Sequence, residues 1–346
     1  MLARLPASPD IYPQKIDLSR WMVLLVRLDA DAYHRSSFLD DRILGPAITG
    51  AWASVDSAIA ASRLARSGRP VHFIFHTGHV GSTLVSRLLD ETGTVLSLRE
   101  PLPLRTIAEA YDTLGRTDAL LSEAQFGAAF AMLMQMWGRG YQATRCVVIK
   151  ATSSVGRMAG ALLARSEGSR AIYLNLRAEP YLATLLAGEN SPTDLRGHGP
   201  ERLRRLQSRI AAPLPPLHAL SIGELAAMSW LAESWSQREA LDRYPGRVIS
   251  IDFDQFLASV GPSMDRIANH FSLPIEPRRL EELGRSPVLT RYSKAPEFAY
   301  TPDVRAQLLR DSRRRNGEEI RKGLAWVEQL ARSDEAVAQV LQSASG

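Results

Sequence analysis

Cysteine is nearly missing from this sequence: Cys146 is the only one among its 346 residues. One cysteine cannot form an intramolecular disulfide, and it excludes metal sites built on several cysteines. No stretch approaches the roughly 20 consecutive apolar residues of a membrane-spanning helix. The first residues also lack the basic region and apolar run of a secretory signal. We therefore expect a cytoplasmic protein without a membrane span.

Several catalytic and binding signatures are missing as well. There is no Gly-x-Ser-x-Gly turn, which argues against an α/β-hydrolase. His72, His76 and His79 lie close together in the sequence, but no helix motif with a carboxylate accompanies them, so we expect no metal site. The formal net charge of +5 favours anionic ligands. Since no long run of Lys and Arg is interleaved with aromatic residues, we expect no nucleic-acid partner.

Short apolar runs of strand length do recur along the chain. They cover residues 71–75, 94–98, 146–149, 171–176 and 247–251. Segments with helical apolar spacing separate them. Strands that alternate with helices, and that lack polar alternation of their own, are typical of a parallel sheet covered on both faces. The sequence therefore predicts a three-layer, P-loop-like α/β fold, with a central parallel sheet of about five strands flanked by helices.

The pattern also suggests a division of the chain. Residues 1–66 are predicted to be a mostly helical N-terminal extension, although the apolar run 21–28 is also compatible with a strand. Residues 67–346 are predicted to form the α/β domain. Within it, the polar stretch around 189–216 contains Pro and Gly, and we expect a mobile insertion there.

The most informative segment follows the first apolar run. It reads His76-Thr77-Gly78-His79-Val80-Gly81-Ser82-Thr83 and joins a strand to a helix. In that geometry, backbone N–H groups and the helix dipole converge on one point. Gly78 and Gly81 let the backbone approach a phosphate closely, and two hydroxyls follow them. No lysine precedes Ser82, so this is not a Walker A loop. The plain alternative is an ordinary turn with Ser82 as the helix N-cap.

Charged residues follow the other strands, at the edge where open α/β sheets bind ligands. Arg99 and Glu100 follow the second strand, Lys150 the third and Arg177 the fourth. A basic loop around residues 291–294 comes late in the chain. Each of these charges, taken alone, is equally compatible with a solvated surface group.

In this order and spacing, the motifs resemble those of sulfotransferases. The family's 5′-phosphosulfate loop has a basic residue, Ser-Gly-Thr-Thr and apolar helix residues after a strand. Here Gly81-Ser82-Thr83-Leu84-Val85 is similar to its Gly-Thr-Thr-Leu-Leu part, while His79 stands where the family has Lys or Arg. The strand ends are laid out as in tyrosylprotein-type and bacterial sulfotransferases. The resemblance covers residues 71–254 and the late basic loop.

The resemblance implies transfer of a sulfuryl group from 3′-phosphoadenosine-5′-phosphosulfate (PAPS) to a hydroxyl or amine, without a metal. Glu100 would be the general base that takes the acceptor proton, and a protonated His79 would stabilise charge on the departing phosphate. The loop from Thr77 to Thr83 would hold the 5′-phosphosulfate. The whole loop set is Thr77, Gly78, His79, Val80, Gly81, Ser82 and Thr83.

The remaining implied roles concern binding. Arg177 would bind the nucleotide 3′-phosphate. In the family a serine eight residues after this arginine supports the 3′-phosphate site. Leu185 stands at that position here and has no hydroxyl, so the neighbouring Thr184 would take the serine's place. Arg291 and Lys294 would close over the nucleotide. Contacts to the substrate are implied for Arg99, Arg105 and Lys150.

Two other functions stay open at this point. One is a nucleotide-dependent phosphotransferase on a P-loop-like fold, which the missing loop lysine disfavours. The other is a catalytically degenerate, sulfotransferase-like protein that binds a nucleotide or a protein partner; His79 and Leu185 favour it. The expected partners are a nucleotide donor and an acceptor that the sequence does not identify. Oligomeric state is also open, a homodimer included.

Overall fold

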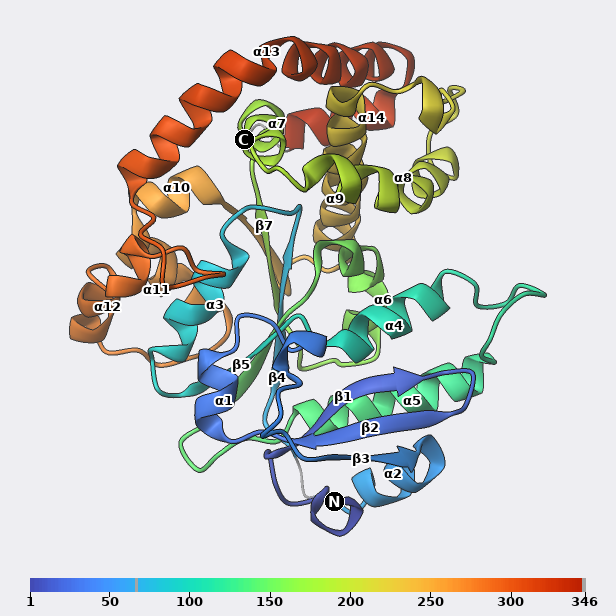
Figure 1. The fold of residues 1–346 in the computed structure, drawn as a ribbon, viewed down its shortest axis with the longest axis vertical. Coiled ribbons are helices and arrows are strands. Elements are labelled where there is room, and N and C mark those ends of the chain that lie inside the picture. The colour runs from blue at the N-terminus through green and yellow to red at the C-terminus, as the bar shows by residue number, and fades with distance from the viewer. Residues whose placement is uncertain (66–67, 344–346) are drawn as a thin grey trace.

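A five-stranded parallel sheet forms the centre of the molecule (Figure 1). The computed structural model describes residues 1–65 and 68–343. The strands are β4 (Val71–His76), β5 (Val95–Arg99), β6 (Cys146–Lys150), β7 (Ala171–Asn175) and β8 (Val248–Asp252). Their order is β5-β6-β4-β7-β8, and every neighbouring pair is parallel. The predicted three-layer α/β fold and its five strands are confirmed.

These segments form a buried parallel sheet because alternate residues face two different cores. On β4, Ile74 packs into one core, whereas Phe73 and Phe75 pack into the other. All six residues of β4 are buried. A strand buried on both faces needs no exposed polar face, which explains why the apolar runs lack regular polar alternation.

Helices cover both faces of the sheet. The core on one face includes α3 (Ser82–Asp90), α7 (Ala178–Leu186), α9 (Ile222–Arg243), α10 (Phe253–Ala258), α11 (Val260–His270), α12 (Pro277–Leu283), α13 (Pro302–Ser333) and α14 (Glu335–Ser343). The core on the other face includes α4 (Leu102–Tyr111), α5 (Glu123–Trp137) and α6 (Ala159–Ala164). Capping boxes at Ser122 and Ser221 start α5 and α9. The long α13 arches over one end of the molecule in Figure 1.

The N-terminal segment is not mostly helical, so that expectation is wrong. It forms an antiparallel sheet of β1 (Ile11–Asp17), β2 (Met22–Arg27) and β3 (Gly50–Ser54), with two short helices, α1 (Ala30–Arg35) and α2 (Val55–Ser62). Alanine favours helices, yet Ala51 and Ala53 lie in β3 and pair with β2, because strand pairing overrides weak local propensity.

The N-terminal sheet also shares the core of the α/β unit. Ile11, Val23 and Val55 pack in the same cluster as Phe73 of the central sheet. Arg139, which follows α5, donates hydrogen bonds to the carbonyl oxygens of Leu5, Ser8 and Ile11. The segment is therefore packed into the fold rather than appended to it.

The stretch 189–216, expected to be a mobile insertion, contains a helix, α8 (Ser191–Gln207), which packs on α9. Its polar residues misled the prediction because several are buried. Arg205 Nη2 lies 2.6 Å from Oε1 of the fully buried Glu233. Arg205 also pairs with Glu201, 2.5 Å away on the same helix.

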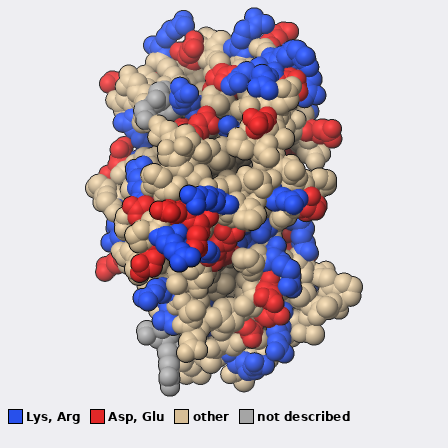
Figure 2. All heavy atoms as spheres, turned by 90° about the vertical axis from the view of Figure 1, so that its left-hand side faces the viewer, with Lys and Arg blue, Asp and Glu red and all other residues tan. Residues whose placement is uncertain are grey.

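None of the helices within 1–65 and 68–343 combines the length and apolar character that a membrane crossing needs. On the face drawn in Figure 2, Lys and Arg side chains are interspersed with Asp and Glu rather than gathered into one continuous basic patch.

Candidate active site

The loop between β4 and α3 adopts a conformation that only a few residue types accept easily. Its φ angles are positive at Gly78 (+104°), His79 (+55°) and Gly81 (+69°). A Cβ atom at Gly81 would lie 1.9 Å from the Phe253 ring, so this position requires glycine. Gly81, and not Ser82, is the N-cap of α3, and it makes no side-chain cap hydrogen bond. The alternative of an ordinary Ser82-capped turn is therefore wrong.

Hydrogen-bond donors gather in this loop without protein acceptors. Within the described part of the chain, the amides of Val80, Gly81, Ser82 and Thr83 have no acceptor. The hydroxyls of Thr77 and Thr83 are buried and also lack a partner there. Buried polar groups are rarely left unpaired in folded proteins. A convergent set of unpaired donors at the start of a helix is suited to an anion.

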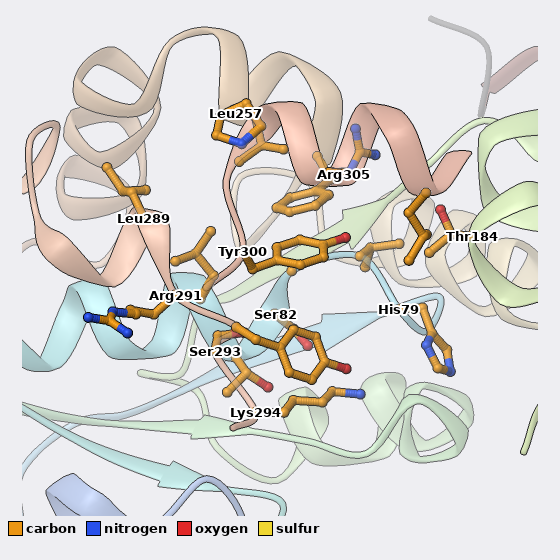
Figure 3. Close-up of a pocket in the computed structure, with 18 of the residues that line it drawn as sticks. His79, Ser82, Thr184, Leu257, Leu289, Arg291, Ser293, Lys294, Tyr300 and Arg305 are labelled. Carbon is orange, nitrogen blue, oxygen red and sulfur yellow. The ribbon is translucent and has the colours of Figure 1, made fainter. Parts of the chain in front are cut away.

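A cavity of about 410 Å³ opens above the loop (Figure 3). That volume is within the range of small-molecule binding sites. Of the residues predicted to bind the nucleotide, the cavity is lined by His79, Val80, Gly81, Ser82, Thr83, Thr184, Arg291 and Lys294. The structure thus brings together the loop, α7 and the late basic loop, which lie far apart in the sequence.

The aromatic walls of this cavity were missed from the sequence. Phe253 comes from α10, and Tyr292, Phe298 and Tyr300 come from the late loop. The Tyr292 and Tyr300 rings lie 5.5 Å apart at 55°. Three aromatic residues within nine positions of a basic loop were a usable signal, because flat ligands stack on such rings. Arg305, also missed, lines the cavity and pairs with Asp254 at 2.7 Å.

Glu100 and Lys150 form an ion pair at the ends of β5 and β6. The Glu100 amide also donates to the Lys150 carbonyl oxygen at 2.7 Å, and the Thr152 hydroxyl lies 3.4 Å from Glu100 Oε2. Burial lowers the pKa of Lys150, while the Glu100 carboxylate opposes that shift. Lys150 is almost fully buried, whereas the Glu100 side chain is 17% exposed. The carboxylate is the partner that a substrate can reach.

Glu100 does not line the large cavity. A smaller cavity of about 90 Å³ is lined by Gly78 and His79 of the 77–83 loop and by Thr152. Since Thr152 contacts Glu100, the carboxylate lies near this second cavity.

Three arginines from the sequence analysis are placed differently. Arg99 is buried and pairs with Asp90; its other donors bind Ser86 and the carbonyl oxygens of Tyr33, His34 and Ser36. Its predicted contact with substrate is therefore wrong. The sequence does not show whether a charged side chain at a strand end faces the ligand-binding edge or the protein core. Arg105 is exposed and pairs with Glu109. Arg177 is exposed and does not line the large cavity, so its role stays a prediction.

The histidines of this region are neutral at pH 7. Burial by the surrounding protein, and then repulsion by Lys294, lower the pKa of His79 to about 4, although the residue as a whole keeps part of its surface exposed. His76 accepts a hydrogen bond from the Gly78 amide at Nδ1 (3.1 Å), so Nε2 carries the proton and donates to the Ala151 oxygen at 2.9 Å. Burial holds the pKa of His76 well below its usual value. The expected cationic role of His79 does not fit this setting.

We predict that stability falls as the pH drops from about 6.5 toward 4. Burial lowers the pKa of His72 from 6.5 to about 4. Between these pH values the unfolded chain takes up protons that the folded protein does not. Protonation therefore stabilises the unfolded state relative to the folded one. For His72 alone the full effect is on the order of 3 kcal/mol.

Urea unfolding at pH 7 and pH 5 measures this loss. His72→Phe keeps an aromatic ring stacked on Phe271 (4.9 Å in the wild type). It should reduce the difference between the two pH values, even though it also removes the bond from the Arg170 amide at both. An unchanged difference would show that His72 does not contribute.

Comparisons with known proteins complete the description. No protein-family model matches the sequence, and no curated protein matches it. Among solved structures, the sulfotransferase domain from the curacin biosynthetic pathway is 16% identical over 68% of this chain and 84% of that one, with a TM-score of 0.40. Mouse sulfotransferase SULT7A1 complexed with PAP is 9% identical over 85% of this chain and 97% of that one, with a TM-score of 0.42.

A third similar structure is sulfotransferase STF9 from Mycobacterium avium, 14% identical over 75% of this chain and 80% of that one, with a TM-score of 0.41. Identities and TM-scores at this level carry no conclusion about activity. All three of these solved structures are sulfotransferases, and the likeness is one of fold.

Proposed function

We propose that this protein is a sulfotransferase that moves a sulfuryl group from PAPS to a hydroxyl or amine acceptor. One observation carries the proposal. The unpaired amides of residues 80–83 and the buried Thr83 hydroxyl lie in the lining of an aromatic-walled cavity, and the Glu100 carboxylate contacts Thr152, which lines a second cavity shared with the same loop. Such an arrangement fits a donor that has an anionic end and a flat ring, attacked by a deprotonated acceptor.

The donor's parts match the parts of the large cavity. Its 5′-phosphosulfate would take the amides of residues 80–83 and the hydroxyls of Thr77 and Thr83. The adenine ring would stack against the aromatic walls, with Phe253 and Tyr300 as the candidate partners. For the 3′-phosphate, Thr184 and Arg291 line the cavity, and Arg177 remains the candidate outside it.

The acceptor side rests on Glu100. An acceptor hydroxyl or amine near this carboxylate would lose its proton to Glu100 while its oxygen or nitrogen attacks sulfur in line with the leaving group. Lys150 would fix the orientation of the Glu100 carboxylate through the ion pair between them. We assign Lys150 this positioning role rather than direct contact with the substrate.

A protein that binds the nucleotide without turnover is the second candidate. One observation favours it: His79 is neutral at pH 7, so the loop supplies no positive charge where the resemblance expects one. The phosphotransferase reading has less support, because the loop offers no lysine side chain to the phosphates.

Transfer of radiolabelled sulfate from PAPS to a panel of phenols, sugars, peptides and amines, with EDTA present, tests the proposal. We expect label in at least one acceptor class, without need for a divalent metal. Binding of the nucleotide with no labelled acceptor would support the second candidate. Mg²⁺-dependent phosphoryl transfer from ATP, with none from PAPS, would contradict both sulfotransferase readings.

A further inference from the structure

The phosphate-binding loop has no fixed positive charge of its own. His79 occupies the position where a cation would serve, and its ring is neutral at pH 7. Lys150, at the end of β6 next to β4, already forms an ion pair with Glu100. Sulfuryl transfer leaves additional negative charge on the departing 5′-phosphate, and an enzyme normally places a donor or cation there. A cation for that position therefore has to come from another part of the chain.

Lys294 is in the right place. It lines the large cavity together with Ser82 and Thr83. Within the described residues, no carboxylate lies within ion-pair distance of it. Figure 3 shows its side chain extending along the cavity on the side of His79. Its charge acts on His76, His79 and Lys150 alike, lowering the pKa of each, so it lies near all three.

Contacts with the N-terminal segment and with α3 hold Lys294 in position. Arg87, on the helix that starts at the phosphate-binding loop, donates from Nε to the Ser293 oxygen at 2.8 Å. The same guanidinium donates from Nη2 to the Ser37 hydroxyl, also at 2.8 Å. Next to Ser37, the Phe38 ring centroid lies 6.0 Å from the Lys294 ammonium. These contacts fix the loop that carries Lys294 relative to α3.

We propose that Lys294 supplies the positive charge at the 5′-phosphosulfate, in place of the basic residue that the loop lacks. This inference rests on the proposed function. As the acceptor atom forms its bond to sulfur, the bond between sulfur and the bridging oxygen breaks. The electron pair stays on the 5′-phosphate of the nucleotide, and the acceptor proton goes to Glu100. The Lys294 ammonium then neutralises the charge that develops on the 5′-phosphate.

Nucleotides that differ in their phosphates locate the charge. Calorimetry would compare the product nucleotide 3′-phosphoadenosine-5′-phosphate (PAP), 5′-AMP and 3′-AMP on the wild type and Lys294→Met. We expect PAP and 5′-AMP to lose at least about tenfold in affinity, as for a hydrogen bond to a charged group, and 3′-AMP to change little. Arg285→Met removes an equal charge from an exposed site outside the cavity, and should leave all three affinities unchanged.

Turnover gives the second readout. Lys294→Met should lower kcat about 100- to 1,000-fold, as removal of one transition-state donor does. Lys294→Arg keeps the charge and should retain most of the activity that the methionine variant loses. If Lys294→Met matched Arg285→Met, or if Lys294→Arg fell as low as Lys294→Met, the inference would be overturned.

Two outcomes separate this inference from the proposed function. A loss confined to 3′-AMP and PAP would move Lys294 to the 3′-phosphate, overturning the inference while the sulfotransferase reading stands. A wild-type protein that neither binds PAP nor uses PAPS would overturn the proposed function, and the inference with it.

Discussion

Glu100→Gln lowers kcat for sulfuryl transfer about 100- to 10,000-fold, the usual contribution of a general base, and leaves PAP affinity within about threefold. The reason is positional: Glu100 contacts Lys150 and Thr152, and it is not among the residues that line the donor cavity. Glutamine has nearly the same shape and still offers Lys150 an oxygen, so the fold should tolerate the change. Initial-rate kinetics and PAP calorimetry measure the two effects.

Glu109→Gln is the matched control for this substitution. Glu109 lies on α4, is exposed and pairs only with Arg105 among the described residues. Its loss should change neither kcat nor PAP affinity. If Glu100→Gln reduced PAP affinity as strongly as kcat, the carboxylate would belong to the donor site, and its assignment as base would be wrong.

Gly81→Ala should nearly abolish nucleotide binding. The new Cβ would meet the Phe253 ring at 1.9 Å, and the φ angle of +69° is unfavourable for alanine. The backbone cost is about 1 kcal/mol, and the overlap adds about 1–3 kcal/mol. A shift of the Phe253 ring can relieve the overlap, but the backbone cost is relieved only if the loop moves away from its present path, which disperses the amides. PAP calorimetry and thermal unfolding measure the consequences.

Gly93→Ala separates the two costs. Gly93 has nearly the same φ, +73°, but no heavy atom lies within 4 Å of its added Cβ. This variant should show the backbone cost alone and bind PAP normally. Equal behaviour of the two variants would mean that the close approach of Phe253 to the loop does not matter. Gly81/Phe253 double substitution to alanine should recover part of the lost stability.

The sequence predicted the parts of the fold in which local pattern and tertiary environment agree. The strands of the central sheet are buried on both faces, so their apolar runs are continuous and their ends are clear. The β4–α3 loop was recognisable because positive φ angles there require residues such as glycine. β3 lies in the N-terminal segment that was predicted to be mostly helical; its alanines favour a helix, and only pairing with β2 makes it a strand.

The sequence did not reveal the direction in which side chains point, or the contacts between segments that lie far apart in the chain. Arg99 is the last residue of β5 and Glu100 follows it directly, yet the positive φ of Glu100 (+52°) turns the chain, and the two side chains pair with different partners. The aromatic walls come from α10 and the late loop, which meet the 77–83 loop only in three dimensions. The charged residues of α8 looked like a solvated loop in the sequence, because composition does not reveal that Arg205 forms a buried ion pair.

Calorimetry with PAP, 5′-AMP and ADP, with EDTA present, tests the central claim most directly: that the loop and the cavity above it form a site for a nucleotide phosphorylated at both the 5′ and 3′ positions. We expect PAP to bind at least about tenfold more tightly than 5′-AMP or ADP, because a charged phosphate contact is worth about 1.5–3 kcal/mol. Equal affinity for all three nucleotides, or binding of ADP alone in a parallel titration with Mg²⁺ in place of EDTA, would contradict the account.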